Sequence, residues 1–173
     1  MTSSKVNIGL INPKSPDNVG SVMRAAGNYQ VEDIFYTGTR YPRALSYQGR
    51  SVDMSRKVSV GVTVSGVDDL INSVDKDTEI ICVELVVNAI PLPAFKHPDN
   101  AFYIFGPEDG SISQDIIDKA DSVVYVPTIG CMNLAASVNV LLYDRLAKSN
   151  THKLDNDLVK KSRDTNNRLK IPL

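Results

Sequence analysis

The chain has 173 residues, 42% of them hydrophobic and 23% charged, which suffices for one globular domain with a sizeable core. No apolar run approaches the roughly 18–20 residues that a membrane-spanning helix needs, and the start lacks the hydrophobic stretch of a signal peptide. We therefore expect a cytoplasmic protein with no membrane attachment. Cys82 and Cys131 both lie in apolar sequence and are expected to be buried free thiols rather than a disulfide.

The net charge of −1 conceals three blocks of opposite sign. Residues 1–60 carry eight Lys and Arg against four Asp and Glu, residues 61–144 carry three against thirteen, and residues 145–173 carry eight against three. A polyanion binds a local patch, so the two basic blocks are compatible with a nucleic-acid partner. Solvated surface is the commoner meaning of such blocks, and charge alone does not decide.

Apolar residues alternate between strand-like and helix-like patterns along the chain. Strands are predicted over residues 6–11, 33–36, 58–64, 79–85, 101–105 and 122–126, and helices from about 18 to 26 and over 67–74, 114–120 and 133–149. Strands separated by helices indicate a mainly parallel sheet flanked by helices, the α/β class. Residues 1–149 are thus expected to form one domain, and the basic residues 150–173 a tail or loose helix outside its core.

Three loops after predicted strands are unusual, and open α/β sheets bind their ligands in such loops. The first, residues 12–24, is polar and places Gly20 and Arg24 one turn apart on the helix face opposite the apolar residues. Gly20 leaves space beneath Arg24, and the start of the helix offers free N–H groups to an anion. Taken alone, this pattern is more typical of a capped helix with a surface arginine.

The second and third loops are glycine-containing. Over residues 105–111, two glycines let the backbone approach a ligand closely, and Glu108 places a carboxylate at the end of a strand. A tight turn with solvent-facing acids would explain the same residues. Over residues 126–134, an apolar loop with Asn133 suits a flat adenine ring, although Asn133 could simply cap the last helix.

No other chemistry has a comparable pattern. His97 and His152 lack the spacing of metal ligands, so no metal is expected. Neither a serine–histidine–acid nor a cysteine–histidine arrangement has a local signature. A nucleotide-dependent enzyme of ordinary doubly wound fold would fit the alternation, but the chain has no phosphate-binding fingerprint.

In their order and spacing, the three loops resemble the motifs of the SpoU/TrmH branch of the SPOUT RNA methyltransferases. Asn18, Gly20 and Arg24 match the first motif, residues 105–110 match the second, and residues 126–128 with 132–134 match the third. The similarity extends over roughly residues 5–148. It implies that residues 1–149 form a minimal methyltransferase domain of SPOUT type, with a C-terminal deep trefoil knot.

The same resemblance implies methyl transfer from S-adenosylmethionine to a ribose 2′-hydroxyl of structured RNA, with tRNA favoured over rRNA, in an obligate homodimer whose active sites lie at the subunit interface. Arg24 is the expected catalytic residue, and Asn18 is expected to fix its loop. An arginine is normally protonated. Binding the phosphate next to the target ribose is therefore as reasonable a role for Arg24 as acting as the base that accepts the hydroxyl proton. The residues expected to bind the cofactor are Leu85, Gly106, Glu108, Val126, Ile129, Met132 and Asn133.

One departure from the family pattern motivates an alternative. Cys131 and Met132 stand where many relatives have Ser-Leu before the asparagine, which leaves the role of Cys131 open. A catalytically inactive protein of the same fold, serving in RNA binding or assembly, is therefore the competing hypothesis. The retained Arg24, Glu108 and Asn133 favour the active enzyme.

RNA recognition is expected in the segment from residue 36 to residue 57, where cations for phosphates alternate with tyrosines for unpaired bases. The residues predicted to bind RNA are Arg40, Tyr41, Arg43 and Arg50. A surface loop with incidental aromatic rings is the alternative for this segment. The basic tail is a second candidate.

Overall fold

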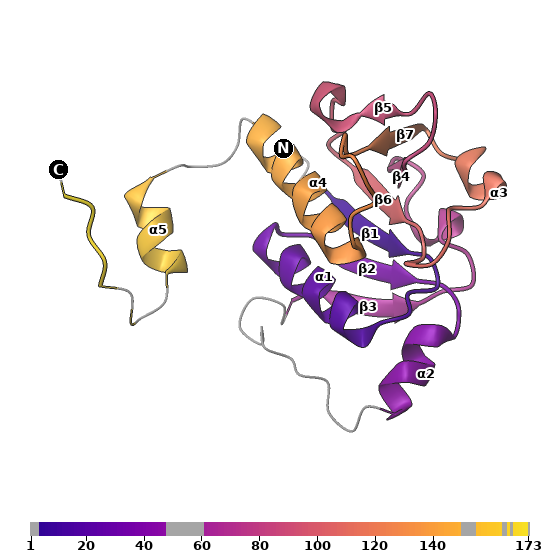
Figure 1. Ribbon diagram of the computed structural model, residues 1–173, viewed down its shortest axis with the longest axis horizontal. Helices are drawn as coiled ribbons and strands as arrows, with labels where there is room; N and C mark the ends of the chain where they lie inside the picture. The colour runs from indigo at the N-terminus through magenta and orange to yellow at the C-terminus, as the bar shows by residue number, and fades with distance from the viewer. Residues whose placement is uncertain (1–3, 48–60, 150–154, 164–165, 167, 173) are drawn as a thin grey trace.

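Seven parallel strands form one sheet in the structure, a computed structural model that describes residues 4–47, 61–149, 155–163, 166 and 168–172 (Figure 1). In the order in which they lie side by side, the strands are β3 (Thr63–Gly66), β2 (Asp33–Tyr36), β1 (Val6–Leu10), β6 (Ala101–Phe105), β4 (Glu79–Val83), β7 (Ser122–Tyr125) and β5 (Ile90–Pro91). Every neighbouring pair runs parallel. The predicted α/β class with a mainly parallel sheet is confirmed.

β1 and β6 pair near the middle of the sheet, and every residue of both strands is buried. Because both faces of the sheet are covered, β6 is a continuous apolar run instead of an alternating one. Close packing requires Gly9, since a Cβ there would lie 2.8 Å from Cζ of Phe102. The register pairs Leu10 with Phe105, so the two strands end level with each other.

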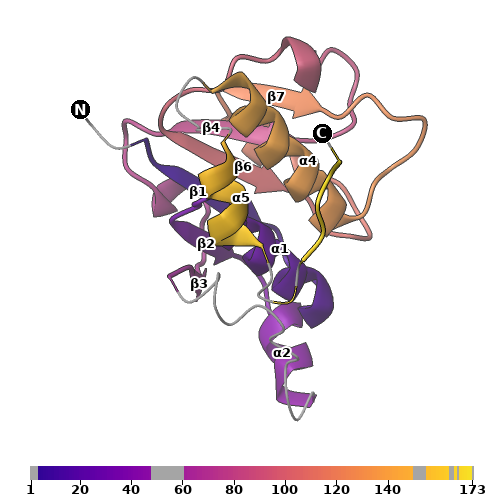
Figure 2. The same ribbon diagram turned by 90° about the vertical axis from the view of Figure 1, so that its left-hand side faces the viewer.

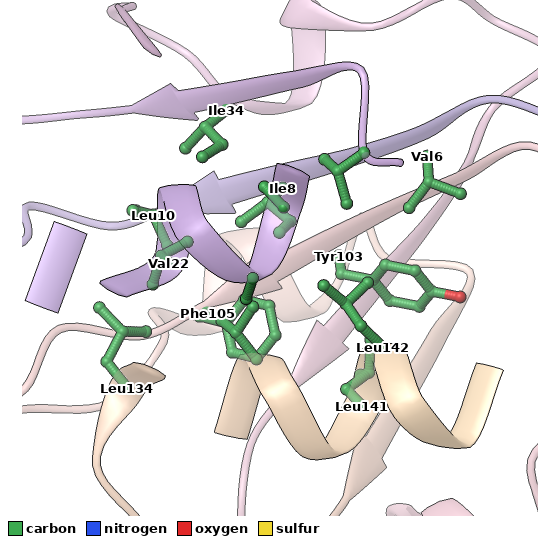
Figure 3. Close-up of a cluster of buried hydrophobic side chains, with 14 of the residues drawn as sticks. Val6, Ile8, Leu10, Val22, Ile34, Tyr103, Phe105, Leu134, Leu141 and Leu142 are labelled. Carbon is green, nitrogen blue, oxygen red and sulfur yellow. The ribbon is translucent and has the colours of Figure 1, made fainter. Parts of the chain in front are cut away.

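Two helices, α1 (Pro16–Asn28) and α4 (Leu134–Lys148), pack side by side on one face of the sheet (Figures 1 and 2). Each begins at a side-chain cap: Ser15 Oγ accepts from the N–H of Asn18 at 3.3 Å, and Asn133 Oδ1 accepts from the N–H of Ala136 at 2.7 Å. The larger apolar core lies between these helices and the sheet; Figure 3 labels Val6, Ile8, Leu10, Val22, Ile34, Tyr103, Phe105, Leu134, Leu141 and Leu142.

The opposite face carries a smaller core cluster, which includes Leu70, Phe102 and Ile104. A short turn of 3₁₀ helix, η1 (Ile71–Ser73), and the single-turn helix α3 (Gln114–Ile117) contribute side chains to it. The helix predicted over residues 67–74 is thus wrong. The Asp69 carboxylate accepts hydrogen bonds from the Ile71 N–H and the Asn72 amide, and such local bonds compete with helix formation.

Three further elements differ from the prediction. Helix α2 (Arg40–Tyr47) lies in a segment for which no helix was predicted. Its Pro42 is compatible with a first helical turn, where no N–H partner is needed. β5 (Ile90–Pro91) and the 3₁₀ turn η2 (Leu92–Ala94) were missed because two residues at a sheet edge leave no periodic pattern.

The last helix, α5 (Asn156–Ser162), has no buried residue. It lies apart from the sheet and its covering helices in Figure 1, and Figure 2 looks at the molecule from the side on which it lies. Across the described parts of the chain, no helix has the length and apolar character to cross a bilayer.

A cluster of polar side chains lies near the amino ends of β1 and β6. His97, whose side chain is 5% exposed, lies 2.6 Å from the Tyr103 hydroxyl through Nδ1 and 2.9 Å from Asp144 through Nε2. Arg145 donates to the Tyr103 hydroxyl at 3.1 Å, and Lys148 pairs with Asp144 at 2.6 Å. Burial lowers the pKa of His97, and the hydrogen bond and charge of Asp144 oppose this only in part.

This lowered pKa predicts that stability falls in mild acid. The ordinary histidine pKa is 6.5, so below that pH the unfolded chain binds a proton more readily than the folded one, and the free energy of unfolding decreases as pH falls through the folded pKa. Urea denaturation between pH 7.5 and 5.5 measures this slope. His97→Gln should flatten it; His152 is present in both proteins, so its contribution cancels. An unchanged slope in His97→Gln would assign the acid sensitivity to other groups.

Candidate active site

A pocket of about 300 Å³ lies at the carboxyl ends of β4, β6 and β7. Its walls come from the three loops that the sequence singled out and from the end of β4: residues 83–85, 105–108 and 110, 125–126, 128 and 130–134, together with Asn18 and Ser137. The parallel register explains this convergence, because Phe105 is level with Val83, and Val83 is level with Val124. Loops leaving these strands therefore start at one point.

Six of the seven residues expected to bind a cofactor line this pocket: Leu85, Gly106, Glu108, Val126, Met132 and Asn133. Ile129 does not. The Thr128 hydroxyl donates to the carbonyl of Gly130 at 2.7 Å, which turns the loop tightly and leaves Ile129 at its tip, fully exposed. The structure thus brings together residues from all three motifs, and their part in binding a ligand stays a prediction.

Glu108 joins the second loop to the first. Its carboxylate accepts hydrogen bonds from the backbone N–H groups of Lys14 at 2.9 Å and Ser15 at 3.2 Å, and from the side-chain amide of Asn18 at 3.3 Å. Burial alone would raise the pKa of Glu108, but these bonds outweigh it together with one from its own N–H, so the pKa is lowered. The carboxylate is therefore ionised at neutral pH and fixes the start of α1 against the pocket.

Arg24 lies outside the pocket wall. It is exposed on α1, while Val19, Val22, Ala25 and Ala26 of the same helix are buried. The predicted division of α1 into an apolar face and a face carrying Arg24 is confirmed. A Cβ at Gly20 would meet nothing within 4 Å, so this face of the chain is open around Gly20.

Glu84 is a pocket residue that the sequence analysis missed. It directly follows β4, and its Oε2 accepts from the N–H of Ile112 at 2.9 Å. A Cβ on Gly106 would lie 3.3 Å from the Ile112 side chain and 3.4 Å from this oxygen, so glycine is what lets the second loop approach β4. The signal that could have found Glu84 is an acidic residue directly after a buried strand.

The two cysteines differ in exposure. Cys82 is buried in β4, and burial, helped by the charge of Glu84, raises the pKa of its thiol to about 12. Cys131 is exposed and lines the pocket. The expectation that both thiols are buried was wrong for Cys131, because its loop lines an open pocket and is not packed into the core.

The residues predicted to bind RNA have diverse surroundings. Arg43 is exposed on α2. Tyr41 is partly buried and packs edge-on against Tyr36 with ring centroids 5.1 Å apart. Arg40 pairs with Asp109 at 2.7 Å, and Arg50 lies outside the described residues.

The chain belongs to the SpoU rRNA Methylase family, whose profile matches residues 5–143. It is 24% identical over 156 residues to the tRNA (cytidine-2′-O-)-methyltransferase TrmJ of Methanocaldococcus jannaschii, an alignment that covers 83% of this chain and 68% of TrmJ. The family expected from the three motifs is confirmed, and the chain is thereby placed among RNA methyltransferases.

Solved structures share the fold at low sequence identity. The SpoU methyltransferase AviRb of Streptomyces viridochromogenes, in complex with AdoMet, matches with a TM-score of 0.69 and 16% identity over 85% of this chain and 61% of that one. A structure from work on the 2-OH methylation of C/U34 on tRNA matches with a TM-score of 0.67 and 16% identity over 85% of this chain and 92% of that one.

The difference in exposure between Cys131 and Cys82 can be tested by their reactivity. In the folded protein at pH 8, a thiol-specific disulfide reagent should label Cys131 rapidly, and Cys82 should react only after unfolding, because it is buried and its pKa is about 12. Cys131→Ser should therefore remove the rapid phase. Rapid labelling of Cys82 in that variant would contradict the packing of β4.

Proposed function

We propose that the protein transfers a methyl group from S-adenosylmethionine to a ribose 2′-hydroxyl of structured RNA, with tRNA favoured over rRNA. The observation that carries this proposal is the pocket in which the second and third motifs meet, tied to the first motif by Glu108 and Asn18. The 2′-O activities named for TrmJ and for the tRNA structure support the choice of a ribose hydroxyl and of tRNA.

The pocket fits the proposed cofactor in size and chemistry. Its volume of about 300 Å³ is at the lower end of the range for small-molecule sites, and Leu85, Val126 and Met132 offer apolar wall for an adenine ring. The backbone at Gly106 closely approaches Glu84 and Ile112, which makes a cradle that a larger residue would fill. When bound, the cofactor would supply the methyl group from its sulfonium sulfur; the transfer would replace a C–S bond by a C–O bond, leave the sulfur as a neutral thioether and pass the hydroxyl proton to water.

The chain's own residues contribute alignment, which is what such a reaction needs from a protein. Glu108 holds the Asn18 side chain and the start of α1 in one position. Arg24, one and a half turns further along α1, binds the phosphate beside the target ribose. Its permanent charge suits that task better than proton abstraction.

The proposal includes a homodimer with the active site at the subunit interface. Val87, two residues beyond the pocket residue Leu85, is 85% exposed, Ile129 in the third loop is fully exposed, and Tyr143 on α4 is 63% exposed. A contiguous apolar patch commonly marks an interaction surface, and in this proposal these side chains contribute to one that the second copy covers. The deep trefoil knot of the SPOUT type also belongs to this proposal; residues 84–85, 126, 128 and 130–134, which follow β4 and β7, line the same pocket.

A second candidate is an inactive protein that binds or assembles RNA. The observation in its favour is Cys131, a thiol at the pocket where many relatives carry a hydroxyl. Calorimetry with S-adenosylmethionine separates the two candidates, since the inactive protein need not bind it. Protection of Cys131 from the thiol reagent by the cofactor provides an independent readout.

The proposed reaction predicts ribose methylation. Purified protein incubated with methyl-labelled S-adenosylmethionine and separate tRNA and rRNA fractions should leave label in alkali-resistant dinucleotides, chiefly from tRNA. Heat-denatured protein serves as the control. Label found only in methylated bases would overturn the proposed acceptor, and label chiefly in rRNA would overturn the proposed RNA.

Removing the Arg24 side chain should affect methyl transfer without affecting cofactor binding. Arg24→Ala should lower methyl transfer by about a hundredfold, the effect that misplacing the reacting group by about 1 Å can have, while the Kd for cofactor stays within about twofold. Ser21→Ala, an exposed neighbour on α1, is the matched control and should leave both quantities unchanged. Equal loss of transfer and of cofactor binding in Arg24→Ala would mean that Arg24 supports the pocket instead.

A further inference from the structure

Arg40, the first residue of α2, binds two loops at once. Its Nε and Nη2 donate to the backbone carbonyl of Asn12 at 3.0 and 2.6 Å. Its Nη1 donates to both carboxylate oxygens of Asp109 at 2.8 and 2.7 Å. The side chain is 29% exposed, so its charge is committed to these partners and largely shielded from solvent.

The surrounding backbone is built tightly around this contact. Asn12 has a φ of 42° and Gly38 a φ of 79°, and a Cβ at Gly38 would overlap the Asn12 side chain. Asn12 N donates to the Thr37 hydroxyl at 3.3 Å, and Arg40 N donates to Asn12 Oδ1 at 3.4 Å. Left-handed backbone at a residue other than glycine costs energy and persists only where its surroundings hold it.

The contact of Arg40 with Asn12 and Asp109, called the clamp below, is a second attachment of the loop that Glu108 already binds. Glu108 binds residues 14, 15 and 18 directly, and the adjacent Asp109 reaches residue 12 through Arg40. The two consecutive carboxylates therefore fix the loop after β1 both at its start, residue 12, and where it enters α1. Through residues 106–108 and 110, the same stretch of chain forms a wall of the pocket.

We propose that Arg40 is a positioning residue that sets the second loop of the cofactor pocket through Asp109, and is not a ligand of RNA phosphates. The proposal rests on the proposed function for the identity of the pocket's ligand. It assigns to the first residue of α2 a contact with the pocket loop, and it leaves Arg43, exposed three residues later on the same helix, as the residue available to RNA.

A set of variants tests this assignment: Arg40→Gln, Asp109→Asn, their double variant, Arg40→Lys, and Arg43→Gln as the matched control. Arg40→Gln and Asp109→Asn should each raise the Kd and KM for S-adenosylmethionine about three- to tenfold with a smaller change in kcat, and the double variant should add little, because both remove one interaction. Arg40→Lys should recover only part of the loss, since an ammonium cannot bridge both partners as a guanidinium does. Arg43→Gln should leave the cofactor Kd unchanged.

RNA affinity, measured across salt concentrations, distinguishes a positioning role of Arg40 from phosphate binding. If Arg40 positions the loop, Arg40→Gln weakens RNA binding no more than Arg43→Gln does, and Asp109→Asn leaves it unchanged. If Arg40 binds a phosphate, Arg40→Gln lowers the slope of log Kd against log salt by about one, and Asp109→Asn tightens RNA binding by releasing the guanidinium. That result, with an unchanged cofactor Kd, would overturn the proposal.

Hydrogen exchange keeps the test independent of the proposed function. The amides of residues 12–15 and 106–112 should exchange faster in Arg40→Gln and Asp109→Asn than in the wild type or Arg43→Gln. If the wild-type protein binds no S-adenosylmethionine, the proposed function fails, and the clamp still stands or falls on the exchange rates. Lower melting temperatures with unchanged exchange in these loops would show a merely structural role and overturn the clamp.

Discussion

The level ends of the parallel strands are the constraint on which the site depends. Leu10 pairs with Phe105, Phe105 with Val83, and Val83 with Val124. Four strands from separate parts of the chain therefore end within one residue of the same level, and the loops that follow them must share the space beyond. A one-residue shift would turn every buried side chain of a strand to the opposite face, so core packing in β1 and β6 fixes the loops as firmly as it fixes the sheet.

Within that space, two carboxylates position the main chain of the loops. Glu108 receives two backbone N–H groups and the Asn18 amide, and Glu84 receives the N–H groups of Leu85 and Ile112. Hydrogen bonds to a charged acceptor are stronger than neutral ones, and leaving a partly buried charge without them is costly. Glu108 is exposed, but the acids around the pocket also hold its loops in place through these bonds, which a tight turn with merely solvent-facing acids would not do.

Sequence patterns predicted what depends on periodic or short-range chemistry. The strands at residues 33–36 and 101–105, the cap at Asn133 and the apolar face of α1 are found where they were expected, because each is determined by neighbours along the chain. The order of the strands, the edge strand β5 and the exposure of Cys131 depend on contacts between distant segments. Arg40 shows the limit best: a cation among tyrosines was assigned to RNA, and its partner Asp109 lies 69 residues away.

The geometry divides the work of the site between two kinds of residue. Contacts within one chain shape the pocket, since Gly106, Glu84 and Glu108 place its loops by packing and by hydrogen bonds already complete in the domain. Arg24 stands outside this wall on an open face of α1. Under the proposed function, an acceptor ribose is brought between the pocket and that face, and the second copy of the chain in the proposed homodimer completes the enclosure. In that proposal, specificity for an RNA depends on what spans this gap, whereas the pocket itself is set by the sheet.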